Sequence, residues 1–225
     1  MALDGNSKIF IIIPCWNESL HLGQVINRVK PYGEVVIVDD GSSDNSFAIA
    51  SNLGVKVLRH VINRGQGAAL ETGDQYAQSQ GADVVVHFDA DGQHQVEDIP
   101  LMIQPIIEGR ADIVLGSRFL GKSDRLPFIK KWLILKPANL LQNFLFNLKL
   151  TDAQNGLRAM SAKALSQITI TQDGFAHCSE IMEQISLKGL KYLEVPVTVV
   201  YDEFGQGFLA GLKILIDLLV GKLNK

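Results

Sequence analysis

Asp89 and Asp91 are the side chains in this 225-residue sequence best suited to binding a metal ion. They follow the β-branched run at residues 83–87 and precede a helical pattern that begins near residue 97, so we place them in a loop at the carboxyl end of a strand. Open α/β sheets bind ligands at that edge. Because the backbone turns there, both carboxylates can reach one hard cation, and Mg²⁺ or Mn²⁺ shared with a diphosphate is favoured. Asp-x-Asp alone is also common in solvated turns, so the other motifs must decide.

The first half of the chain alternates strand and helix patterns. We expect strands at residues 9–13, 34–38, 55–58, 83–87 and 112–115, with the intervening helices ending near residues 30, 53, 79 and 108. Pro14 is expected to end the first strand, and Asn17 or Ser19 to cap the helix after it. This alternation predicts a mainly parallel sheet with right-handed crossovers. Since polar motifs follow successive strands, they should gather along one edge of the sheet.

The second half is less regular. Residues 126–150 read as amphipathic helices broken at Pro137, followed by a polar loop at residues 151–158. Helices near 161–167 and 179–188, a strand at 193–200 and an apolar tail at 208–223 complete the chain. Residues 126–150 and the tail each fit two arrangements. They lie at a membrane surface, or they bury against the sheet or another subunit. A membrane surface, a membrane-protein partner and a homo-oligomer therefore all stay open.

The composition and the absence of certain motifs argue against several classes of function. The net charge of -3 and the pI of about 5.9 argue against nucleic acid as a partner. Cys15 and Cys178 show neither disulfide nor zinc-ligand spacing. The sequence lacks a signal-peptide pattern and an apolar run of about eighteen residues, so we expect a cytoplasmic location. Neither Gly-x-Gly-x-x-Gly after the first strand nor Gly-x-x-x-x-Gly-Lys-Ser/Thr is present, which disfavours a hydride-transfer Rossmann protein and an ordinary NTPase.

Six polar motifs together carry a resemblance to a known family. In order they are IPCWNE at 13–18, VDDGSSD at 38–44, NRGQGAA at 63–69, DADGQH at 89–94, GSR at 116–118 and DAQNGLR at 152–158. The set resembles family 2 glycosyltransferases, closest to the dolichyl- or polyprenyl-phosphate mannosyl- and glucosyltransferase branch. The resemblance implies an α/β, three-layer GT-A (Rossmann-like) fold with a mainly parallel central sheet. It places the catalytic domain at residues 1–200, with acceptor-side helices at 126–150, and a loop with an amphipathic helix at 201–225.

The resemblance also assigns site residues. The nucleotide pocket is lined by Pro14, Asn17, Glu18 and Asp39, with Asp39 accepting from the base and Asp40 near the ribose. The divalent ion, Mg²⁺ or Mn²⁺, is held by Asp89, Asp91 and Gln93. Arg118 faces the phosphate of a lipid acceptor with Lys130 or Lys131, while Asp152 and Arg158 close the sugar side. Two departures from the family pattern stand out: Gln66 replaces a common Lys, and residues 201–207 lack the basic residues often found there.

These assignments predict an inverting transferase that moves a hexose from a GDP- or UDP-sugar to a polyprenyl phosphate at the inner face of the membrane. A phosphate acceptor is already anionic near neutral pH, so positioning by cations suffices. A saccharide hydroxyl acceptor in envelope polysaccharide synthesis would instead need a general base, for which Asp152, His177 and Glu180 are the candidates. A non-catalytic nucleotide-sugar-binding subunit is a further alternative, because Gln66 removes one cation near the donor.

Overall fold

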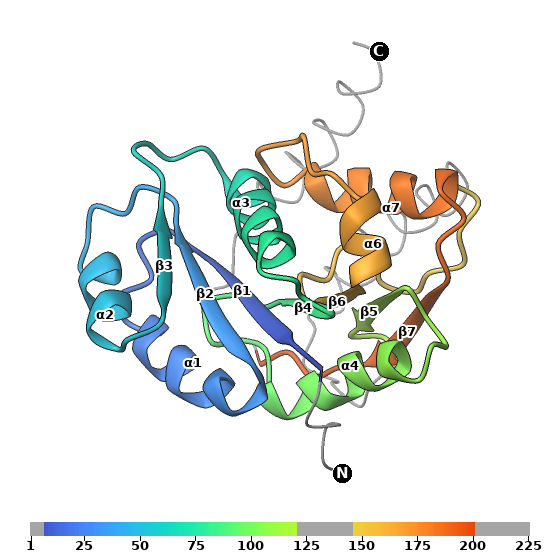
Figure 1. The fold of residues 1–225 in the computed structure, drawn as a ribbon, viewed down its shortest axis with the longest axis horizontal. Coiled ribbons are helices and arrows are strands. Elements are labelled where there is room, and N and C mark those ends of the chain that lie inside the picture. The colour runs from blue at the N-terminus through green and yellow to red at the C-terminus, as the bar shows by residue number, and fades with distance from the viewer. Residues whose placement is uncertain (1–6, 121–145, 201–225) are drawn as a thin grey trace.

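The fold is built on one seven-stranded sheet. The computed structural model describes residues 7–120 and 146–200. Across the sheet the strands run in the order β3 (Lys56–Arg59), β2 (Glu34–Asp39), β1 (Ile9–Cys15), β4 (Val84–His87), β6 (Arg158–Ser161), β5 (Ile113–Ser117) and β7 (Tyr192–Pro196). The labels in Figure 1 follow this order from β3 to β7. Among the described strands, β6 is antiparallel to its neighbours β4 and β5, and the other pairs are parallel. The expected mixed α/β class with a mainly parallel sheet is confirmed.

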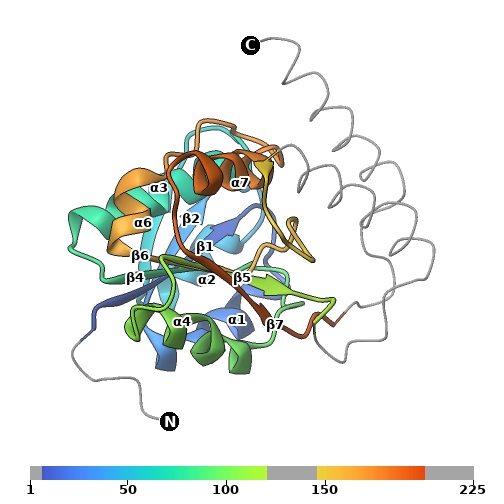
Figure 2. The ribbon, with the colours of Figure 1, turned by 90° about the vertical axis from the view of Figure 1, so that its right-hand side faces the viewer.

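Helices cover both faces of this sheet and make three layers (Figure 2). One face carries α1 (Leu22–Val29), α2 (Ser46–Asn52) and α4 (Ile99–Ile107), and the other carries α3 (Gln66–Ser79), α6 (Ala162–Gln167) and α7 (His177–Leu187); the short 3-10 turns are η1 (Lys30–Tyr32) and η2 (Val96–Asp98). Strand β1 alternates between the two cores: Ile11 packs under α1, and Ile12 packs under α3. The continuous apolar run is therefore buried on both sides, as expected for a central parallel strand.

Strand β6 explains how motifs from both halves of the chain share one edge. The carboxyl ends of the parallel strands lie at that edge, and an antiparallel strand brings its amino end there. Arg158 begins β6 and is paired with His87 at the end of β4. The loop at residues 151–157 consequently lies beside the Asp89 loop. We predicted only a polar loop up to Arg158, because a four-residue strand with the sequence RAMS lacks β-branched residues.

The expectation that Pro14 ends β1 is wrong. The strand continues to Cys15, and Pro14 pairs in register with Val38 of β2. Pairing with β4 on the other side stops at Ile12. Because proline lacks only the backbone N–H, it is tolerated in a strand wherever no neighbour requires that donor.

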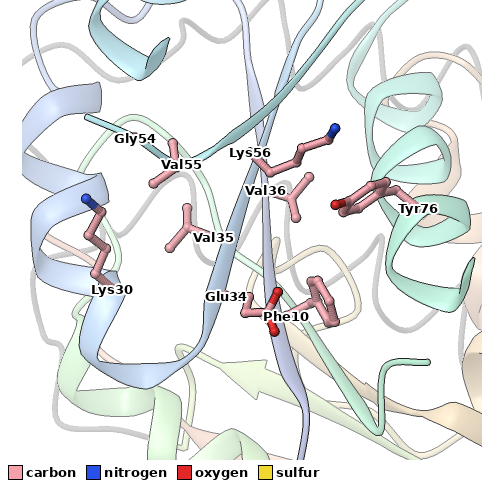
Figure 3. Close-up of a pocket in the computed structure, with 9 residues that line it drawn as sticks. All are labelled: Phe10, Lys30, Glu34, Val35, Val36, Gly54, Val55, Lys56 and Tyr76. Atoms are coloured by element: carbon pink, nitrogen blue, oxygen red, sulfur yellow. The ribbon is translucent and has the colours of Figure 1, made fainter. Parts of the chain in front are cut away.

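A pocket of about 260 Å³ lies at the opposite, amino-terminal edge of the sheet (Figure 3). Its lining includes Phe10, Glu34 and Lys56, which stand at the beginnings of β1, β2 and β3. The Lys56 ammonium lies 5.0 Å from the centroid of the Tyr76 ring. None of the polar motifs lines this pocket, so it is separate from the ligand edge predicted from the sequence.

Several expectations fall outside the described residues. They concern the helices expected within 126–145, the tail at 208–223, Lys130 and Lys131, and the loop at 201–207. The proposed division at residue 200 stays a prediction. Among the helices of residues 7–120 and 146–200, none has the length and apolar character needed to cross a membrane.

Candidate active site

Asp89 and Asp91 lie in a turn directly after β4. Asp89 accepts a hydrogen bond from the Gln66 amide (Oδ1–Nε2, 2.9 Å) and pairs with His94 (Oδ2–Nε2, 3.1 Å). Asp91 accepts from the backbone N–H of Gln93 at 2.9 Å. Gly92 has φ 75°, a left-handed conformation that glycine adopts readily and that turns the chain between the motif residues. The motif is thus a fixed loop on the ligand edge of the sheet.

The charges around this turn favour a cation. Burial raises the pKa of Asp91 above its ordinary value, and the charge of Asp89 raises it further. Burial and the charge of Asp91 likewise raise the pKa of Glu18. Burial opposes ionisation of Asp89 too, but hydrogen bonding to His94 and the charges of His94 and Arg158 outweigh it and lower its pKa. A positive ion would lower the electrostatic repulsion among these three carboxylates in a partly buried site.

The ligand atoms that this turn offers, carboxylate oxygens, fit Mg²⁺ or Mn²⁺. Magnesium sites in enzymes commonly use one or two protein carboxylates and leave positions for waters and substrate phosphates. Within residues 7–120 and 146–200, no group of three or more His, Cys, Asp and Glu side chains could hold a metal ion. The two carboxylates of Asp89 and Asp91 match this open, substrate-shared kind of site. The Gln93 side chain as a third ligand stays a prediction.

Asn17 joins the loops that follow β1 and β2. It adopts φ 57°, and its side-chain oxygen accepts from the backbone N–H groups of Ser43 (2.9 Å) and Asp44 (3.3 Å). In return, the Ser42 hydroxyl accepts from the Asn17 backbone N–H at 3.0 Å. The expectation that Asn17 or Ser19 caps the first helix is wrong: α1 has His21 at its N-cap, without a side-chain hydrogen bond. Asn17 instead holds the loops after β1 and β2 together.

Asp44 fastens the same two loops and gives a pH-dependent prediction. Its carboxylate accepts from the backbone N–H groups of Ser46 (2.9 Å) and Ser19 (3.1 Å). Desolvation opposes ionisation, but these hydrogen bonds prevail and lower its pKa to about 2. A lowered carboxyl pKa stabilises the fold above the unfolded value of about 4, and this stabilisation is lost as the pH falls towards 2. We expect Asp44→Asn to lower the free energy of unfolding at pH 7, by a difference that shrinks between pH 4 and pH 2 in urea melts. A difference that is constant across this range would contradict the assignment.

Asp39 and Asp40 have different surroundings at the end of β2. Asp39 is fully buried, accepts from the Ser42 N–H (3.2 Å) and forms an ion pair with Arg59 (2.9 Å). Asp40 is 2% exposed and accepts from the backbone N–H groups of Arg64 (2.9 Å) and Gly65 (2.6 Å). It also pairs with the His60 ring at 2.6 Å. Asp40 therefore holds the loop at residues 60–65 in place.

Arg118 and Asp152, predicted to face different substrates, contact each other directly. The guanidinium donates through Nε (2.6 Å) and Nη2 (2.7 Å) to the two oxygens of Asp152, which also accepts the Arg118 backbone N–H at 3.1 Å. The Asp152 side chain is fully buried. Glu194 of β7 accepts the backbone N–H groups of Thr151 (2.8 Å) and Asp152 (2.9 Å), and fixes the loop from the other side. Asp152 therefore orients Arg118, and its burial argues against Asp152 among the three candidate bases for a hydroxyl acceptor.

Glu180 and His177, the other two candidate general bases, also form hydrogen bonds within the fold. Glu180 accepts from the backbone N–H groups of Thr171 and Gln172, each at 2.9 Å, and from the Thr171 hydroxyl. His177 is 1% exposed, and its Nδ1 lies 2.8 Å from the Gly174 carbonyl oxygen. Both side chains organise the segment that leads into α7. Asp152 and His177 are buried, and Glu180 is half-buried but accepts three hydrogen bonds, so each of the three candidate bases already has partners within the fold.

Gly156 makes the 151–157 loop fit against Asp89. A Cβ atom at this position would lie 2.4 Å from Asp89 Oδ2, closer than side chains approach. We expect Gly156→Ala to displace the carboxylate and lower the activity of this site by roughly 10²-fold, since small misplacements at a reacting centre have effects of that size. Gly174→Ala is the matched control, because a Cβ there meets nothing within 4 Å. Equal rates for the two variants would contradict the predicted contact.

The structure adds residues to the predicted set. Gln66, noted only as a departure from the family pattern, donates to Asp89, and His94, quoted in the motif without a role, pairs with it. Glu194 had no signal in the sequence, because its partners are more than forty residues away. Pro14 and Glu18 lie on the same edge, as expected, in β1 and in the loop after it. Arg158 is 1% exposed and lies beneath this edge, near enough to lower the pKa of Asp89.

Comparison with known proteins places this edge in a family. The model of glycosyl transferase family 2 matches residues 10–169, which contain the Asp89 turn and the Arg118–Asp152 pair. The chain belongs to glycosyltransferase family 2. A UDP-N-acetylglucosamine–dolichyl-phosphate N-acetylglucosaminyltransferase of Methanococcus voltae is 34% identical, over 96% of this chain and 97% of that protein. An undecaprenyl-phosphate mannosyltransferase of Micrococcus luteus is 31% identical, over 91% of this chain and 88% of that protein.

The solved structures support the same fold. A glucosyl-3-phosphoglycerate synthase from Mycobacterium tuberculosis, in complex with Mn²⁺ and UDP-glucose, superposes with a TM-score of 0.75. The match covers 96% of this chain and 79% of that one at 18% identity, and at this identity it bears on the fold alone. The predicted family and its likeness to the polyprenyl-phosphate branch are confirmed by the relatives.

Proposed function

We propose that this family 2 glycosyltransferase is an inverting enzyme that transfers a hexose from a nucleotide-diphosphate sugar to a polyprenyl phosphate. The observation that carries the choice of acceptor is the engagement of all three candidate bases within the fold. A phosphate monoester needs no base, because its oxyanion exists near neutral pH, whereas a sugar hydroxyl requires one. The Methanococcus and Micrococcus relatives, which are named for transfer to dolichyl and undecaprenyl phosphate, support a polyprenyl-phosphate acceptor.

On the donor side, Asp89, Asp91 and Gln93 would hold Mg²⁺ or Mn²⁺. A divalent ion bound there stabilises the negative charge that develops on the leaving diphosphate. Gln66 fixes one oxygen of Asp89 by a hydrogen bond, so this carboxylate keeps its orientation when a ligand enters. The mycobacterial synthase that shares this fold was solved with Mn²⁺ and UDP-glucose, and we propose that this chain likewise binds its donor with a divalent ion.

The nucleotide would lie over the loops after β1 and β2. Pro14, Asn17 and Glu18 line one side, and Asp39 is assigned to accept from the base. Asp40 was predicted near the ribose, but its oxygens already accept from Arg64, Gly65 and His60. We therefore assign Asp40 to positioning the 60–65 loop, because a carboxylate surrounded by protein donors has little capacity left for a sugar.

On the acceptor side, Asp152 holds Arg118 in one orientation, and Arg118 would present positive charge to the lipid phosphate together with Lys130 and Lys131. An Arg held by a bidentate carboxylate gives a preorganised charge, which positions an anion with little entropy loss. Arg158 would act on the sugar side of the metal site through its charge. We place the enzyme peripherally at the cytoplasmic face of the membrane, where a polyprenyl phosphate presents its headgroup.

The test is a transfer assay with the full chain, Mn²⁺ or Mg²⁺, a short polyprenyl phosphate and a panel of UDP- and GDP-sugars. We expect metal-dependent formation of a lipid-linked hexose with one donor. Glycosylation of a saccharide acceptor, with no lipid product, would favour the envelope polysaccharide alternative. Donor binding without turnover on either acceptor would favour the non-catalytic subunit.

A further inference from the structure

The Cys178 thiol lies between two basic side chains at the start of α7. Its sulfur is 3.4 Å from Nη2 of Arg158 and 3.5 Å from Nε2 of His177. The residue is partly exposed and is the second residue of the helix. Thiols next to basic groups at helix N-termini are the reactive ones in proteins, because each feature stabilises the thiolate.

Arg158 supplies a second, independent observation. It is 1% exposed, and Nη2 contacts the Asn155 carbonyl oxygen and Cys178. Within the described part of the chain, Nε and Nη1 have no hydrogen-bond partner although both are buried. Buried N–H groups normally have partners, and a charged group without them is costly. The guanidinium that contacts the sulfur through Nη2 therefore has two further buried N–H groups that can donate to an added oxyanion.

The electrostatics agree with this geometry. Burial raises the pKa of the Cys178 thiol, but the charges of His177 and Arg158 and their hydrogen bonds lower it to about 6. The groups that act on the sulfur are His177 on its own helix and Arg158 on β6, and Asp89 interacts with both of them from the loop after β4. Cys15, in contrast, is 2% exposed, and burial raises its pKa to about 11. The chain thus carries an internal control thiol.

Two sets of contacts link the thiol to the proposed metal and donor site. Arg158 lowers the pKa of Asp89, so moving its charge alters the carboxylate. His177 packs against Gly67, where a Cβ would lie 3.0 Å from the His177 Cβ. Gly67 also donates its backbone N–H to Asp173 (2.8 Å), and the adjacent Gln66 donates to Asp89. A group added to the sulfur would disturb both sets of contacts.

We propose that Cys178 is a redox modification site whose oxidation switches off the donor site. Hydrogen peroxide is the oxidant. The thiolate attacks one peroxide oxygen, an S–O bond forms as the O–O bond breaks, the sulfur is oxidised to sulfenate, and the other oxygen leaves as water once protonated. The sulfenate oxygen accepts from Nε or Nη1 of Arg158 and draws the guanidinium away from Asp89. This effect on transfer rests on the proposed function; the reactivity of Cys178 does not.

Alkylation of the full chain with iodoacetamide, read by peptide mass spectrometry, tests the reactivity first. We expect Cys178 to be modified at least tenfold faster than Cys15. Between pH 8 and pH 6 its rate should fall roughly twofold, whereas a thiol of ordinary pKa falls roughly seventyfold. A seventyfold fall for Cys178, or equal rates for both cysteines, would overturn the proposal.

Peroxide treatment with a sulfenic-acid probe tests the switch. We expect probe addition at Cys178, at least a tenfold loss of transfer, and recovery with dithiothreitol. The Cys178→Ser variant should keep its activity and resist peroxide, and Cys15→Ser should behave as the unmodified sequence does. Equal inactivation of Cys178→Ser would overturn the switch. If no donor and acceptor give transfer before treatment, the proposed function fails, while the labelling result still decides whether Cys178 is the reactive site.

Discussion

Replacing Asp91 by alanine is expected to lower glycosyl transfer by roughly 10³-fold, equivalent to about 4 kcal/mol of transition-state stabilisation. The carboxylate lies in the fixed turn after β4 and interacts with the charges of Asp89 and Glu18. Its loss removes one protein ligand from the proposed Mg²⁺ or Mn²⁺ site. Initial rates at saturating metal, together with metal titrations of donor binding, measure the effect.

Asp83→Ala provides the matched control for this variant. Asp83 stands at the other end of β4, is exposed and accepts the backbone N–H of Lys8 at 2.8 Å. It should leave the rate and the metal dependence unchanged. Thermal unfolding of both variants separates a lost ligand from a lost fold. If Asp91→Ala keeps normal metal-dependent transfer, the metal site assigned to this turn is wrong.

Arg118→Ala is expected to destabilise the fold by about 3–5 kcal/mol, because it leaves the buried Asp152 carboxylate without its counter-charge. Among molecules that remain folded, the variant should also raise the KM for a polyprenyl phosphate more than the KM for the donor. Urea unfolding and separate titrations of the two substrates measure these effects.

Arg28→Ala is the control for a lost ion pair. Arg28 pairs with Glu97 at 3.2 Å, and both side chains are substantially exposed. Exposed pairs contribute little, so its effect should be much smaller. Asp152→Ala combined with Arg118→Ala should destabilise by less than the sum of the single changes, since the second removes the charge that the first leaves unpaired. Additive effects would show that the two side chains do not act as a pair.

The sequence predicts the fold well where local signals are strong. β1 and β4 are apolar runs buried on both faces, and each is followed by polar motif residues, so their places and their shared edge could be inferred. β6 could not, because four residues leave no clear period and its pairing with β4 and β5 is non-local. Only this antiparallel strand explains why Arg158, which starts a strand, lies at the same edge as Asp89, which follows one.

The site residues likewise fall into those that the sequence predicts and those that it does not. Asp89 and Asp91 are separated by one residue, so their shared role can be deduced from one motif. The Arg118–Asp152 pair joins residues 34 positions apart, and the sequence could suggest a charge on each side but not that the two charges meet. The hydrogen bonds that Glu180 accepts from Thr171 and Gln172 could not be predicted from the sequence either, since they depend on how the loop folds.

The most direct test of the account compares polyprenyl phosphate with the polyprenol of the same chain length as acceptor, with the active donor and Mn²⁺. Because the fold holds Arg118 in one orientation and engages Asp152, His177 and Glu180 in hydrogen bonds, we predict a lipid-linked hexose with the phosphate and none with the alcohol. Equal transfer to the polyprenol would mean that a base activates a hydroxyl, and would contradict the proposed acceptor.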